Sequence, residues 1–561
     1  MAASSTAAVS TWRVLSPSRR AAVNLSMTLC GGQCFHWYAT PRRTFVGAIG
    51  HDVFELREME RDATAPPPRV SDSPLGQSRP APAPSPVTDT HPLGGCDSSW
   101  VEYRRLWPPP DPALLDGISG NGKRSSRTHA RPGPSRTTAA IKETGDEDLL
   151  SHYLSLDVDL PRLWRRWTDS PLTRRHPLVT YLIGNRRPAP PPTTTTTTIT
   201  KKQRDVAATA GLGGVYVPIR HVRQDLHSCL FSFLCSQNNN VTRITGMVYA
   251  LCRAYGDHLC DVDIVSGNVR APSTSPPPVR RPRQGCGTAP PKNTVTSPPF
   301  KASDFAADVP AWLPLYSFPS VAQLTAATEA ELRELGFGYR SKYIVDAVRL
   351  VAETPPATAV AMATPVSPGV MRQHETCVAN HFYAAVLSRH GVYREQRDML
   401  MALPGVGRKV ADCVALFSLS CRHIVPVDTH MAQIAVEYLT DANAPATTAR
   451  SPPSLPVTRK RRRDAPGTPV ECDGGLWNGV LLEWGRQSVA MKEKKNKAAA
   501  GTATRTQRGG ESPPTQRTVD KAPVPALYER HHDAIQGAFA ALFGDHAGWA
   551  HSIFFYYRMR K

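Results

Sequence analysis

The chain has 561 residues, of which 53 are proline, and a formal net charge of +20 at pH 7. A chain of this length can hold several domains, but so much proline predicts that a large part of it forms linkers or insertions. The excess of basic residues suits a polyanionic partner such as nucleic acid, although it does not by itself identify one.

The 12 cysteines are scattered and include no Cys-x-x-Cys pair. This spacing indicates neither a zinc ribbon nor a disulfide framework, so we expect reduced intracellular thiols. No apolar run approaches the length that spans a membrane, and no membrane partner is expected.

The N-terminal segment, residues 1–22, is rich in Ala, Ser and Thr and contains arginines but no acidic residue. This composition is typical of a mitochondrial transit peptide, and a flexible N-terminus can have the same composition. Both interpretations stay open. The folded part is expected to begin near Val23.

Short segments with alternating apolar and polar residues, separated by turn residues, come next. They predict an antiparallel sheet domain over 23–106, interrupted by a low-complexity insertion at 63–98. The segments that contribute are 24–29, 31–37, 43–47, 53–56 and 100–103.

Several segments between the predicted elements consist mainly of Pro, Ser, Thr, Gly and Arg. Such sequences cannot bury enough apolar surface to offset the entropy lost on ordering, so we expect them to be disordered. Long insertions cost a fold little, because loop-closure entropy rises only logarithmically with length. The predicted linker is 107–146, and the predicted insertions are about 187–210, 266–303, 440–474 and 487–523.

The remainder, 147–561, is predicted to form one mainly helical body. A buried helix at 226–235 leads to a polar elbow at 238–240, and a second helix begins near Val241. Asparagine at a helix end is commonly only a cap or a turn residue. Other predicted helices cover 147–167, 375–390, 394–403, 476–490 and 525–543.

Another helix is predicted to begin after Ser320, a suitable N-cap. Two glycines then end a helix, and Tyr339 and Arg340 begin the next. From composition alone, Arg340 reads as a solvated surface residue.

The most informative stretch, residues 400–435, reads as helix, tight hairpin, helix, loop and helix. Pro404 disfavours helix at the residue before it, and Gly405 and Gly407 supply backbone freedom without side-chain bulk. Helix resumes directly afterwards with an apolar stripe. The pattern predicts a helix-hairpin-helix at 395–420, whose backbone N–H groups can bind a phosphate at a helix N-terminus.

Two residues of this stretch suit chemistry on a sugar. Lys409 follows the hairpin, and a neutral lysine amine can attack carbon and form a Schiff base. Asp428 begins the third helix, and a fixed carboxylate suits a sugar that becomes positively charged. The plainer interpretations are a phosphate contact for Lys409 and an N-cap for Asp428. Cys413 shares the helix face of Lys409, and core packing is its plainer interpretation.

The sequences of four segments resemble one protein family. Gly-Val-Gly-Arg-Lys-Val-Ala-Asp-Cys at 405–413, followed by Val-Pro-Val-Asp-Thr-His at 425–430, resembles the 8-oxoguanine DNA glycosylase/lyase branch of the helix-hairpin-helix (HhH-GPD) base-excision glycosylases. The segments 31–37 and 544–555 resemble the same family. The resemblance implies an α+β fold, in which an N-terminal antiparallel, TBP-like sheet domain packs on a mainly helical body.

The resemblance also implies individual roles, with Lys409 as the nucleophile and Asp428 as the catalytic carboxylate. The implied base pocket consists of Gly32, Cys413, Pro426, His551 and Phe555. The residues implied to hold the cytosine opposite the lesion are Asn238, Arg243, Tyr339 and Arg340. The implied phosphate contacts are Gly405, Gly407, Val410 and His430.

The chain departs from the family at two positions. His551 stands where the family usually has the glutamine that reads the Watson–Crick edge of the lesion. His36 replaces an arginine that is usual in this branch. Histidine can donate and accept hydrogen bonds, but its geometry differs from that of glutamine. The strictness of base selection is therefore in question, and the reaction type is not.

These features predict a bifunctional DNA glycosylase/AP lyase that excises 8-oxoguanine opposite cytosine, and related ring-opened purines, from damaged double-stranded DNA. We expect a monomer without cofactor or metal, in the nucleus and also in the mitochondrion if 1–22 is a transit peptide. The basic run 459–463 suits nuclear localisation, an extra DNA contact or a solvated surface. The alternatives are a helix-hairpin-helix glycosylase with another lesion preference and a non-catalytic DNA-binding module.

Overall fold

The structure is a computed structural model. It describes residues 11–16, 18, 23–60, 99–109, 137–169, 176, 178–179, 218–272, 312–355, 373–374, 377, 379–440, 476–503 and 523–559. The insertions predicted at 63–98, at 187–210 and over nearly all of 440–474 lie outside the described residues. No helix in the described part is long and apolar enough to cross a membrane.

The N-terminal domain contains a five-stranded antiparallel sheet with the strand order β1-β5-β4-β3-β2. The strands are β1 (Arg13–Val14), β2 (Trp37–Ala39), β3 (Thr44–Ile49), β4 (Asp52–Glu60) and β5 (Ser99–Trp107). Side chains alternate between its faces. Phe45, paired with Leu56, packs in the core that includes α3 (Thr137–Tyr153), and Val46 packs in a second core on the other face.

Two expectations about this domain are wrong. β1 pairs with β5, and Leu15 is buried, so the folded part begins before Val23. Residues 24–29 do not form a strand, because Leu25–Leu29 is helix α2. The Asn24 side chain caps this helix by accepting a hydrogen bond from the Met27 N–H at 2.8 Å. Its buried residues are three and four positions apart, which suits a helix rather than a strand.

The second core also contains a small sheet within the body that the sequence predicted as helical. Its strands are β6 (His258–Asp263), β7 (Val269–Arg270) and β8 (Trp312–Tyr316), in the order β7-β6-β8. The predicted insertion at 266–303 is therefore wrong at its start, because β7 pairs with β6. The short strands contain few residues, and their alternation is brief, which is why periodicity did not separate them from the neighbouring low-complexity sequence.

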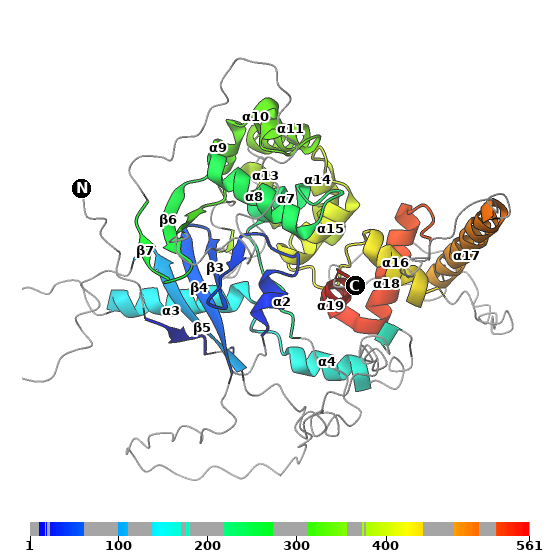
Figure 1. The fold of residues 1–561 in the computed structure, drawn as a ribbon, viewed down its shortest axis with the longest axis horizontal. Coiled ribbons are helices and arrows are strands. Elements are labelled where there is room, and N and C mark those ends of the chain that lie inside the picture. Colours follow the sequence, from blue (N-terminus) through cyan, green and yellow to red (C-terminus); the bar gives the residue numbers. More distant parts are fainter. Residues whose placement is uncertain are drawn as a thin grey trace, which may run out of the picture.

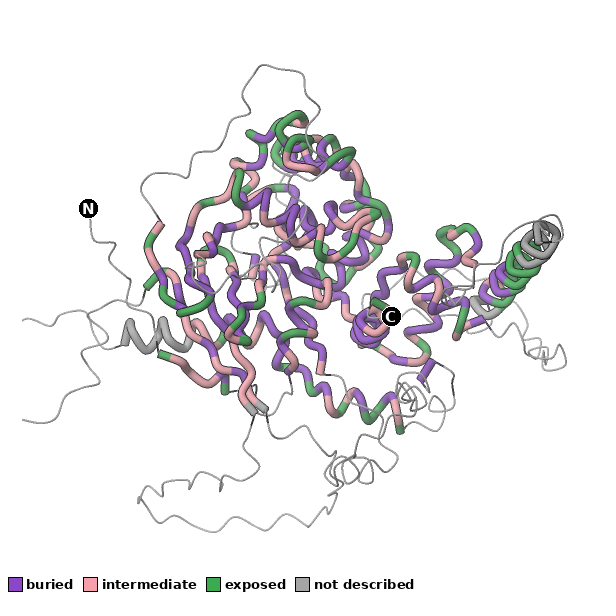
Figure 2. The backbone as a smooth tube through the Cα atoms, viewed as in Figure 1, coloured by how far each residue is buried: buried purple, intermediate pink, exposed green. Residues whose placement is uncertain are grey.

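The central helices bury the largest core and hold the helix-hairpin-helix. They are α7 (Leu226–Leu234), α8 (Val241–Tyr255), α9 (Val321–Thr325), α10 (Glu329–Glu334), α11 (Arg340–Glu353), α13 (His381–Ser388), α14 (Tyr393–Met401) and α15 (Arg408–Phe417). All residues of helix α7 except Ser228 are buried, as its predominantly apolar sequence predicts. Figure 2 shows buried residues concentrated where these helices meet. The predicted elbow, the Ser320 cap and the helix beginning at Arg340 are confirmed.

A second helical group has its own hydrophobic core. It consists of α4 (Leu160–Asp169), α16 (Thr429–Tyr438), α17 (Leu476–Ala503), α18 (Glu529–Phe543), the 3₁₀ turn η4 (Gly544–His546) and α19 (Ala547–Met559). Helix α17 continues past residue 487, so that end of the predicted insertion 487–523 is wrong. Helix α3 likewise begins at Thr137, inside the predicted linker 107–146. Figure 1 shows the sheet on one side of the central helices and this group on the other.

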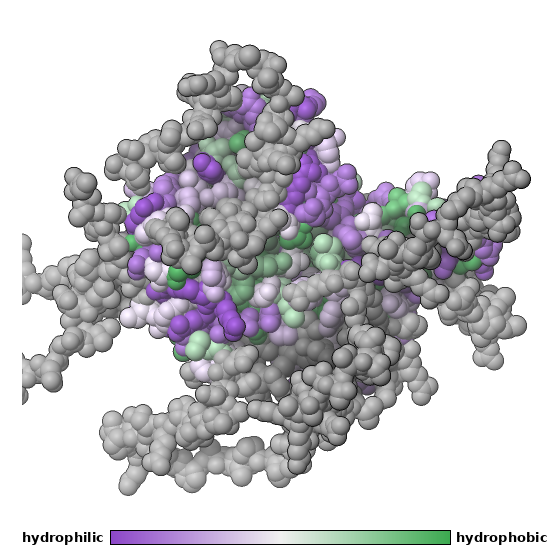
Figure 3. Space-filling model, viewed as in Figure 1, coloured by the Kyte–Doolittle hydropathy of each residue, from purple (hydrophilic) through white to green (hydrophobic). Residues whose placement is uncertain are grey.

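The arrangement places the functional stretch at the junction of the three parts. Helix α15 belongs to the central core, whereas α16 and α19 belong to the second helical group. The segment between α2 and β2 comes from the sheet domain. In Figure 3, hydrophilic residues gather over α14, and hydrophobic residues are visible near the centre of this face.

Candidate active site

The hairpin between α14 and α15 is braced from two sides. Gly405 has φ +78°, and a Cβ at this position would lie 2.6 Å from Cγ of Tyr343 on α11. The Gln237 side chain donates a hydrogen bond to the Gly405 carbonyl at 2.8 Å. By contrast, a Cβ at Gly407, the N-cap of α15, would meet nothing within 4 Å. The start of α15 is therefore open to a phosphate that approaches its N–H groups.

Lys409 lies in the first turn of α15 and reaches back toward α7. Its Nζ donates a hydrogen bond to Ser236 Oγ at 3.1 Å and lies 5.3 Å from the centroid of the Phe233 ring. The amine is thus held at the wall of a cavity rather than projecting into solvent. A lysine in this position is suited to reach a group that enters the cavity.

Asp428 is the N-cap of α16, so the plainer interpretation of this residue is confirmed as a structural role. Its Oδ1 accepts hydrogen bonds from the backbone N–H groups of His430 and Met431, both at 2.9 Å. The buried Val425 and Val427 fix the approach to this cap. The cap orients the carboxylate without preventing a second role, because a carboxylate has two oxygens.

A small cavity brings the predicted catalytic and base-pocket residues together. It is about 40 Å³ in volume, room for very few waters, whereas typical ligand pockets are about 300 Å³ or larger. A purine therefore requires the walls to open. The lining residues are Met27, Gly31, Gly32, Gln33, Ile219, Phe233, Lys409, Cys413, Phe417, Pro426, Asp428, His551, Ser552, Phe555 and Tyr556.

Gly32 and Phe555 lie close together in this cavity wall. Gly32 has φ +89°, and a Cβ there would lie 2.9 Å from Val241 Cγ2 and 3.5 Å from Phe555 Cε1. Only glycine fits without strain, and its backbone is thereby exposed to the cavity. The Phe555 ring also stacks near the ring of His551, with centroids 6.0 Å apart.

His551 is a buried, neutral histidine. Burial lowers its pKa to about 4, with Asp428 opposing the shift and Lys409 adding to it. One ring nitrogen bonds to the Pro426 backbone, and Nδ1 has no hydrogen-bond partner in the structure. Since the neutral ring carries its proton on the bonded nitrogen, Nδ1 is an acceptor.

The Cys413 thiol lies on the Lys409 face of α15, as its spacing predicts. Burial raises its pKa to about 11, while the neighbouring lysine lowers it. Cys413 is therefore a neutral thiol at pH 7, and it acts as a packing and hydrogen-bonding group rather than a nucleophile.

The four residues predicted to hold the opposite cytosine form a separate group at the elbow after α7. The Tyr339 hydroxyl and the Arg340 guanidinium both donate to the Gln237 carbonyl, and Arg340 also donates to the Asn238 carbonyl at 3.2 Å. Arg243 reaches the Gly336 carbonyl. Arg340 is only 3% exposed, which corrects its reading as a solvated surface residue.

The four predicted phosphate contacts differ in what they can offer. Gly405 and Gly407 lie in the hairpin, but the Val410 side chain is buried, so only its backbone could contact DNA. His430 lies at the start of α16, with its ring edge-on to Phe555 at 6.0 Å between centroids.

Several residues of the site were not singled out from the sequence. Ser236 holds Lys409, and Gln237 joins the elbow to the hairpin. Their position directly after a buried helix and before three asparagines was the available signal. His221 and Ser552, whose side chains lie 2.8 Å apart, support the floor of the cavity and had no such signal. The one cluster in the described part that could hold a metal lies elsewhere, at Asp225, His374 and Cys377.

The hairpin lysine and the helix-capping aspartate thus line one cavity, next to a helix-hairpin-helix. The model of the family described as "8-oxoguanine DNA glycosylase, N-terminal domain" matches residues 16–230, which is less than half of the chain. The match includes the segment 31–37 and agrees with the resemblance that the sequence motifs indicate.

Two curated relatives agree with this assignment. The chain is 31% identical over 227 residues to an N-glycosylase/DNA lyase of Saccharomyces cerevisiae, covering 40% of this chain and 43% of that protein. It is 31% identical over 220 residues to the N-glycosylase/DNA lyase OGG1 of Arabidopsis thaliana, covering 39% of this chain and 40% of that protein. The chain thus spans less than half the length of the relatives it matches.

A solved structure gives a more distant likeness. It is the Clostridium acetobutylicum 8-oxoguanine glycosylase/lyase in complex with double-stranded DNA containing cytosine opposite 8-oxoG. The alignment covers 96% of this chain and 92% of that chain, at 14% identity and a TM-score of 0.39.

Proposed function

We propose that this chain is a bifunctional DNA glycosylase/AP lyase that excises 8-oxoguanine opposite cytosine, and formamidopyrimidine purines, in base-excision repair. The observation that carries the proposal is one cavity lined by Lys409, Cys413, Asp428, His551 and Phe555. A non-catalytic DNA-binding module would use the hairpin for phosphates. It would have no use for an amine, a capped carboxylate and an aromatic ring around one cavity.

The reaction begins when the damaged base leaves the stack and enters the opened cavity. The neutral amine of Lys409 attacks C1′ of the deoxyribose, and the bond from C1′ to the base breaks. The base leaves with the bonding electron pair and takes up a proton. Asp428, held by two backbone N–H groups, stabilises the positive charge that develops on the sugar.

The second half of the reaction uses the same lysine. As the sugar ring opens, the nitrogen of Lys409 loses its remaining proton and becomes a Schiff base, while the ring oxygen takes up a proton. Loss of a proton from C2′ then expels the 3′ phosphate and nicks the strand. Ser236 Oγ, 3.1 Å from Nζ, orients the amine before attack.

Base selection is the property for which His551 matters most. Its Nδ1 accepts a hydrogen bond, so it suits a base that presents N–H donors on its Watson–Crick edge, as guanine derivatives do. An adenine derivative presents an unprotonated N1 to the same acceptor and gains nothing there. The Gly32 carbonyl would accept the extra ring N–H of 8-oxoguanine, and Phe555 would stack on the base.

The elbow at 238–240 and the residues around it would select the base opposite the lesion. The guanidinium of Arg340 already fixes the Gln237 and Asn238 carbonyls, which preorganises the loop. Tyr339 and Arg340 would enter the duplex, and together with Asn238 and Arg243 they would hold the cytosine that loses its partner. The backbone around Gly405 and Gly407, together with Val410 N–H and His430, would bind the phosphates.

The proposal extends to the arrangement of the whole chain. The N-terminal sheet is proposed to be TBP-like, and the low-complexity segments to be loops that interrupt one catalytic core. The protein is proposed to act on damaged double-stranded DNA as a monomer, in the nucleus and in the mitochondrion if the N-terminus is a transit peptide. Composition and the basic run 459–463 support this part of the proposal.

Single-turnover assays on the full chain test the proposed function. The substrates are duplexes with 8-oxoguanine opposite cytosine, 8-oxoguanine opposite adenine, 8-oxoadenine opposite cytosine, and no lesion. Fastest base release and nicking with 8-oxoguanine opposite cytosine is the expected result. Release from other lesions alone would replace the proposal by a glycosylase of different preference, and tight binding without release would favour the non-catalytic module.

A further inference from the structure

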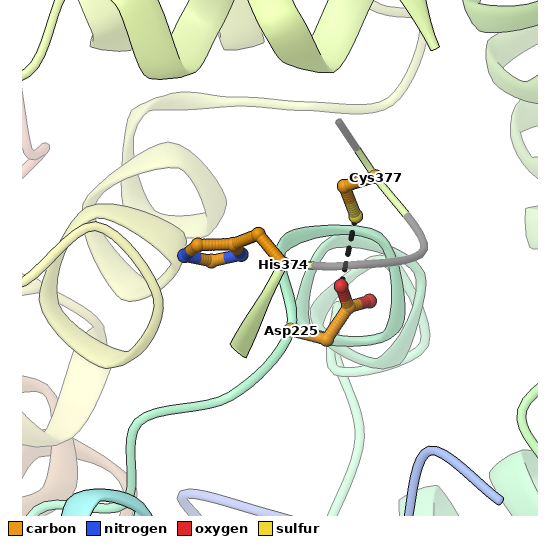
Figure 4. A group of neighbouring side chains, drawn as sticks. All are labelled: Asp225, His374 and Cys377. Atoms are coloured by element: carbon orange, nitrogen blue, oxygen red, sulfur yellow. Dashed lines mark hydrogen bonds between the residues drawn. The ribbon is translucent and has the colours of Figure 1, made fainter. Parts of the chain in front are cut away.

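Three potential metal ligands meet at the start of α7, away from the cavity that holds Lys409. Asp225 is the N-cap of this helix, and His374 and Cys377 come from the segment that precedes α13. One ligand atom from each residue lies within 4.8 Å of the others, and the histidine and cysteine are buried. Figure 4 shows the Cys377 thiol pointing at the Asp225 carboxylate, with the His374 ring extending to one side of this pair.

We propose that Asp225, His374 and Cys377 bind a zinc ion that fastens the segment before α13 to the start of α7. A carboxylate, an imidazole and a thiolate are all zinc ligands, and the mixture of nitrogen and sulfur favours zinc over magnesium or calcium. The proposal concerns a site outside the cavity and does not rest on the proposed function.

The hydrogen bonds of His374 hold its ring in the tautomer that a metal needs. Nδ1 accepts a hydrogen bond from the Leu226 N–H at 3.2 Å, so the ring proton is on Nε2. The other ring nitrogen bonds to the Ser418 backbone. A ring N–H held by a backbone carbonyl is the usual support of a metal-binding histidine. The Nδ1 lone pair thus accepts from the Leu226 N–H, and a zinc ion that binds Nδ1 would replace this hydrogen bond.

The carboxylate and the thiol already share one proton. Cys377 Sγ donates to Asp225 Oδ2 at 2.8 Å, while Oδ1 accepts from the Ser228 N–H at 3.0 Å as the helix cap. Oδ2 can therefore bind a metal while Oδ1 still caps the helix. On zinc binding, the Cys377 proton leaves for solvent, and sulfur and oxygen share the cation instead of the proton.

Charge balance favours the metal-bound form at this place. A thiolate and a carboxylate together neutralise the two charges of Zn²⁺, and the imidazole stays neutral. The thiolate is further supported by the His227 N–H, which lies 3.4 Å from Cys377 Sγ. Negative ligands at the N-terminus of a buried helix are stabilised by its dipole.

A cysteine-based nucleophile is the competing interpretation of these residues. Such a site needs the histidine nitrogen at the thiol, so that the histidine can remove its proton. Here the thiol donates to the carboxylate, and the histidine nitrogen accepts from the Leu226 backbone. The thiol is therefore not paired with a histidine base, although the three ligand atoms lie within 4.8 Å of one another.

Water can supply the fourth ligand. Asp225, His227 and Gln373 line a cavity of about 630 Å³ between the sheet domain and the central helices. Gln373 also ties the same segment to α7, because its side chain donates to the Gln224 carbonyl at 2.6 Å. Zinc would add a stronger tie at the point where these contacts already hold the segment.

Metal analysis of the purified full chain tests the proposal. The wild type and the Asp225→Asn, Cys377→Ser and His374→Ala variants are stripped with chelator, titrated with Zn²⁺, and analysed for bound metal by mass spectrometry. Cys252→Ser is the matched control, since Cys252 is also a buried cysteine but lies outside the cluster. About one zinc per wild-type chain and per control chain is expected. Each cluster variant should bind at least ~100-fold more weakly, because a lost ligand should cost more than a lost supporting group.

A second measurement needs no variant. Co²⁺ added to the stripped wild type should give the thiolate-to-metal charge-transfer band of a sulfur ligand, and Zn²⁺ should abolish the band. Absence of the band would overturn the proposal. Equal zinc binding by Cys377→Ser and Cys252→Ser would overturn it as well.

Discussion

Replacing Asp428 by asparagine separates the two roles of this residue. The Asp428 side chain caps α16 through two hydrogen bonds of 2.9 Å, and asparagine can accept the same bonds. Asparagine and aspartate are about equally good N-caps, so we expect Asp428→Asn to change the free energy of unfolding by only a few tenths of a kcal/mol. The negative charge beside the sugar is nevertheless lost.

The loss of activity should be far larger than the loss of stability. Removing one preorganised electrostatic partner of a transition state costs about 10²–10³ in rate, or about 2.7–4 kcal/mol. We expect Asp428→Asn to slow single-turnover release of 8-oxoguanine by a factor in this range. Asp428→Ala should show the same kinetic defect and, in addition, lose about 1 kcal/mol of stability with the cap.

Thermal unfolding and single-turnover kinetics on the three proteins provide the comparison. For a domain of this size, 1 kcal/mol corresponds to a shift in Tm of about 2–4 °C, which should appear in Asp428→Ala and not in Asp428→Asn. If Asp428→Asn excises the base at close to the wild-type rate, the carboxylate charge has no catalytic part and Asp428 is only a cap.

Three further predictions address the cavity wall, the hairpin and the elbow. Burial lowers the pKa of His551 to about 4, below its ordinary 6.5, so its contribution to stability is present at neutral pH and is lost as pH falls from about 6.5 to 4. Between pH 7 and pH 5, the free energy of unfolding of His551→Gln, measured with urea, should therefore fall by about 2 kcal/mol less than that of the wild type. Identical pH dependences of the two proteins would contradict this. Gly405→Ala should weaken DNA binding at least ~10-fold in a titration, because its Cβ would lie 2.6 Å from the Tyr343 ring, whereas Gly391→Ala, also at positive φ but in open space, should bind DNA normally. Arg340→Ala should reduce the preference for cytosine over adenine opposite the lesion by about 1–3 kcal/mol, as measured by the ratio of excision rates, and an unchanged ratio would remove Arg340 from base reading.

The helix-hairpin-helix was predictable because its signals are local. Proline and glycine fix the hairpin, and the apolar stripe after Gly407 gives α15 its direction and its buried face. The caps at Ser320 and Asp428 follow from residue type and position in the same way. Local chemistry of this kind does not depend on what the rest of the chain contacts.

The errors arose where tertiary contacts decide the structure. Strand β1 is two residues long, and it exists because β5 offers it a free edge, which no pattern around Arg13 reveals. Leu25, Met27 and Leu29 of helix α2 alternate with polar residues, which suits a strand. The segment is nevertheless helical, because the Asn24 side chain caps it and its buried residues pack as one helix face. The contacts of Ser236 with Lys409 and of Cys377 with Asp225 join residues more than 150 positions apart, so spacing could not show them.

The candidate cavity was predictable only through the family resemblance. Gly32, Lys409 and His551 come from three distant segments, and all line one cavity. Composition and periodicity contain no information that joins them. The resemblance supplied the set, and the structure shows that these residues line one cavity.

The most direct test of the proposed chemistry is covalent trapping at Lys409. The full chain is mixed with a duplex carrying one 8-oxoguanine opposite cytosine, and borohydride is added to reduce any Schiff base to a stable amine. The proposal predicts a covalent protein–DNA adduct that maps to Lys409 and is absent with Lys409→Gln and with undamaged DNA. Base release by the wild type without any adduct would contradict the assignment of Lys409 as nucleophile and would leave a glycosylase that relies on water.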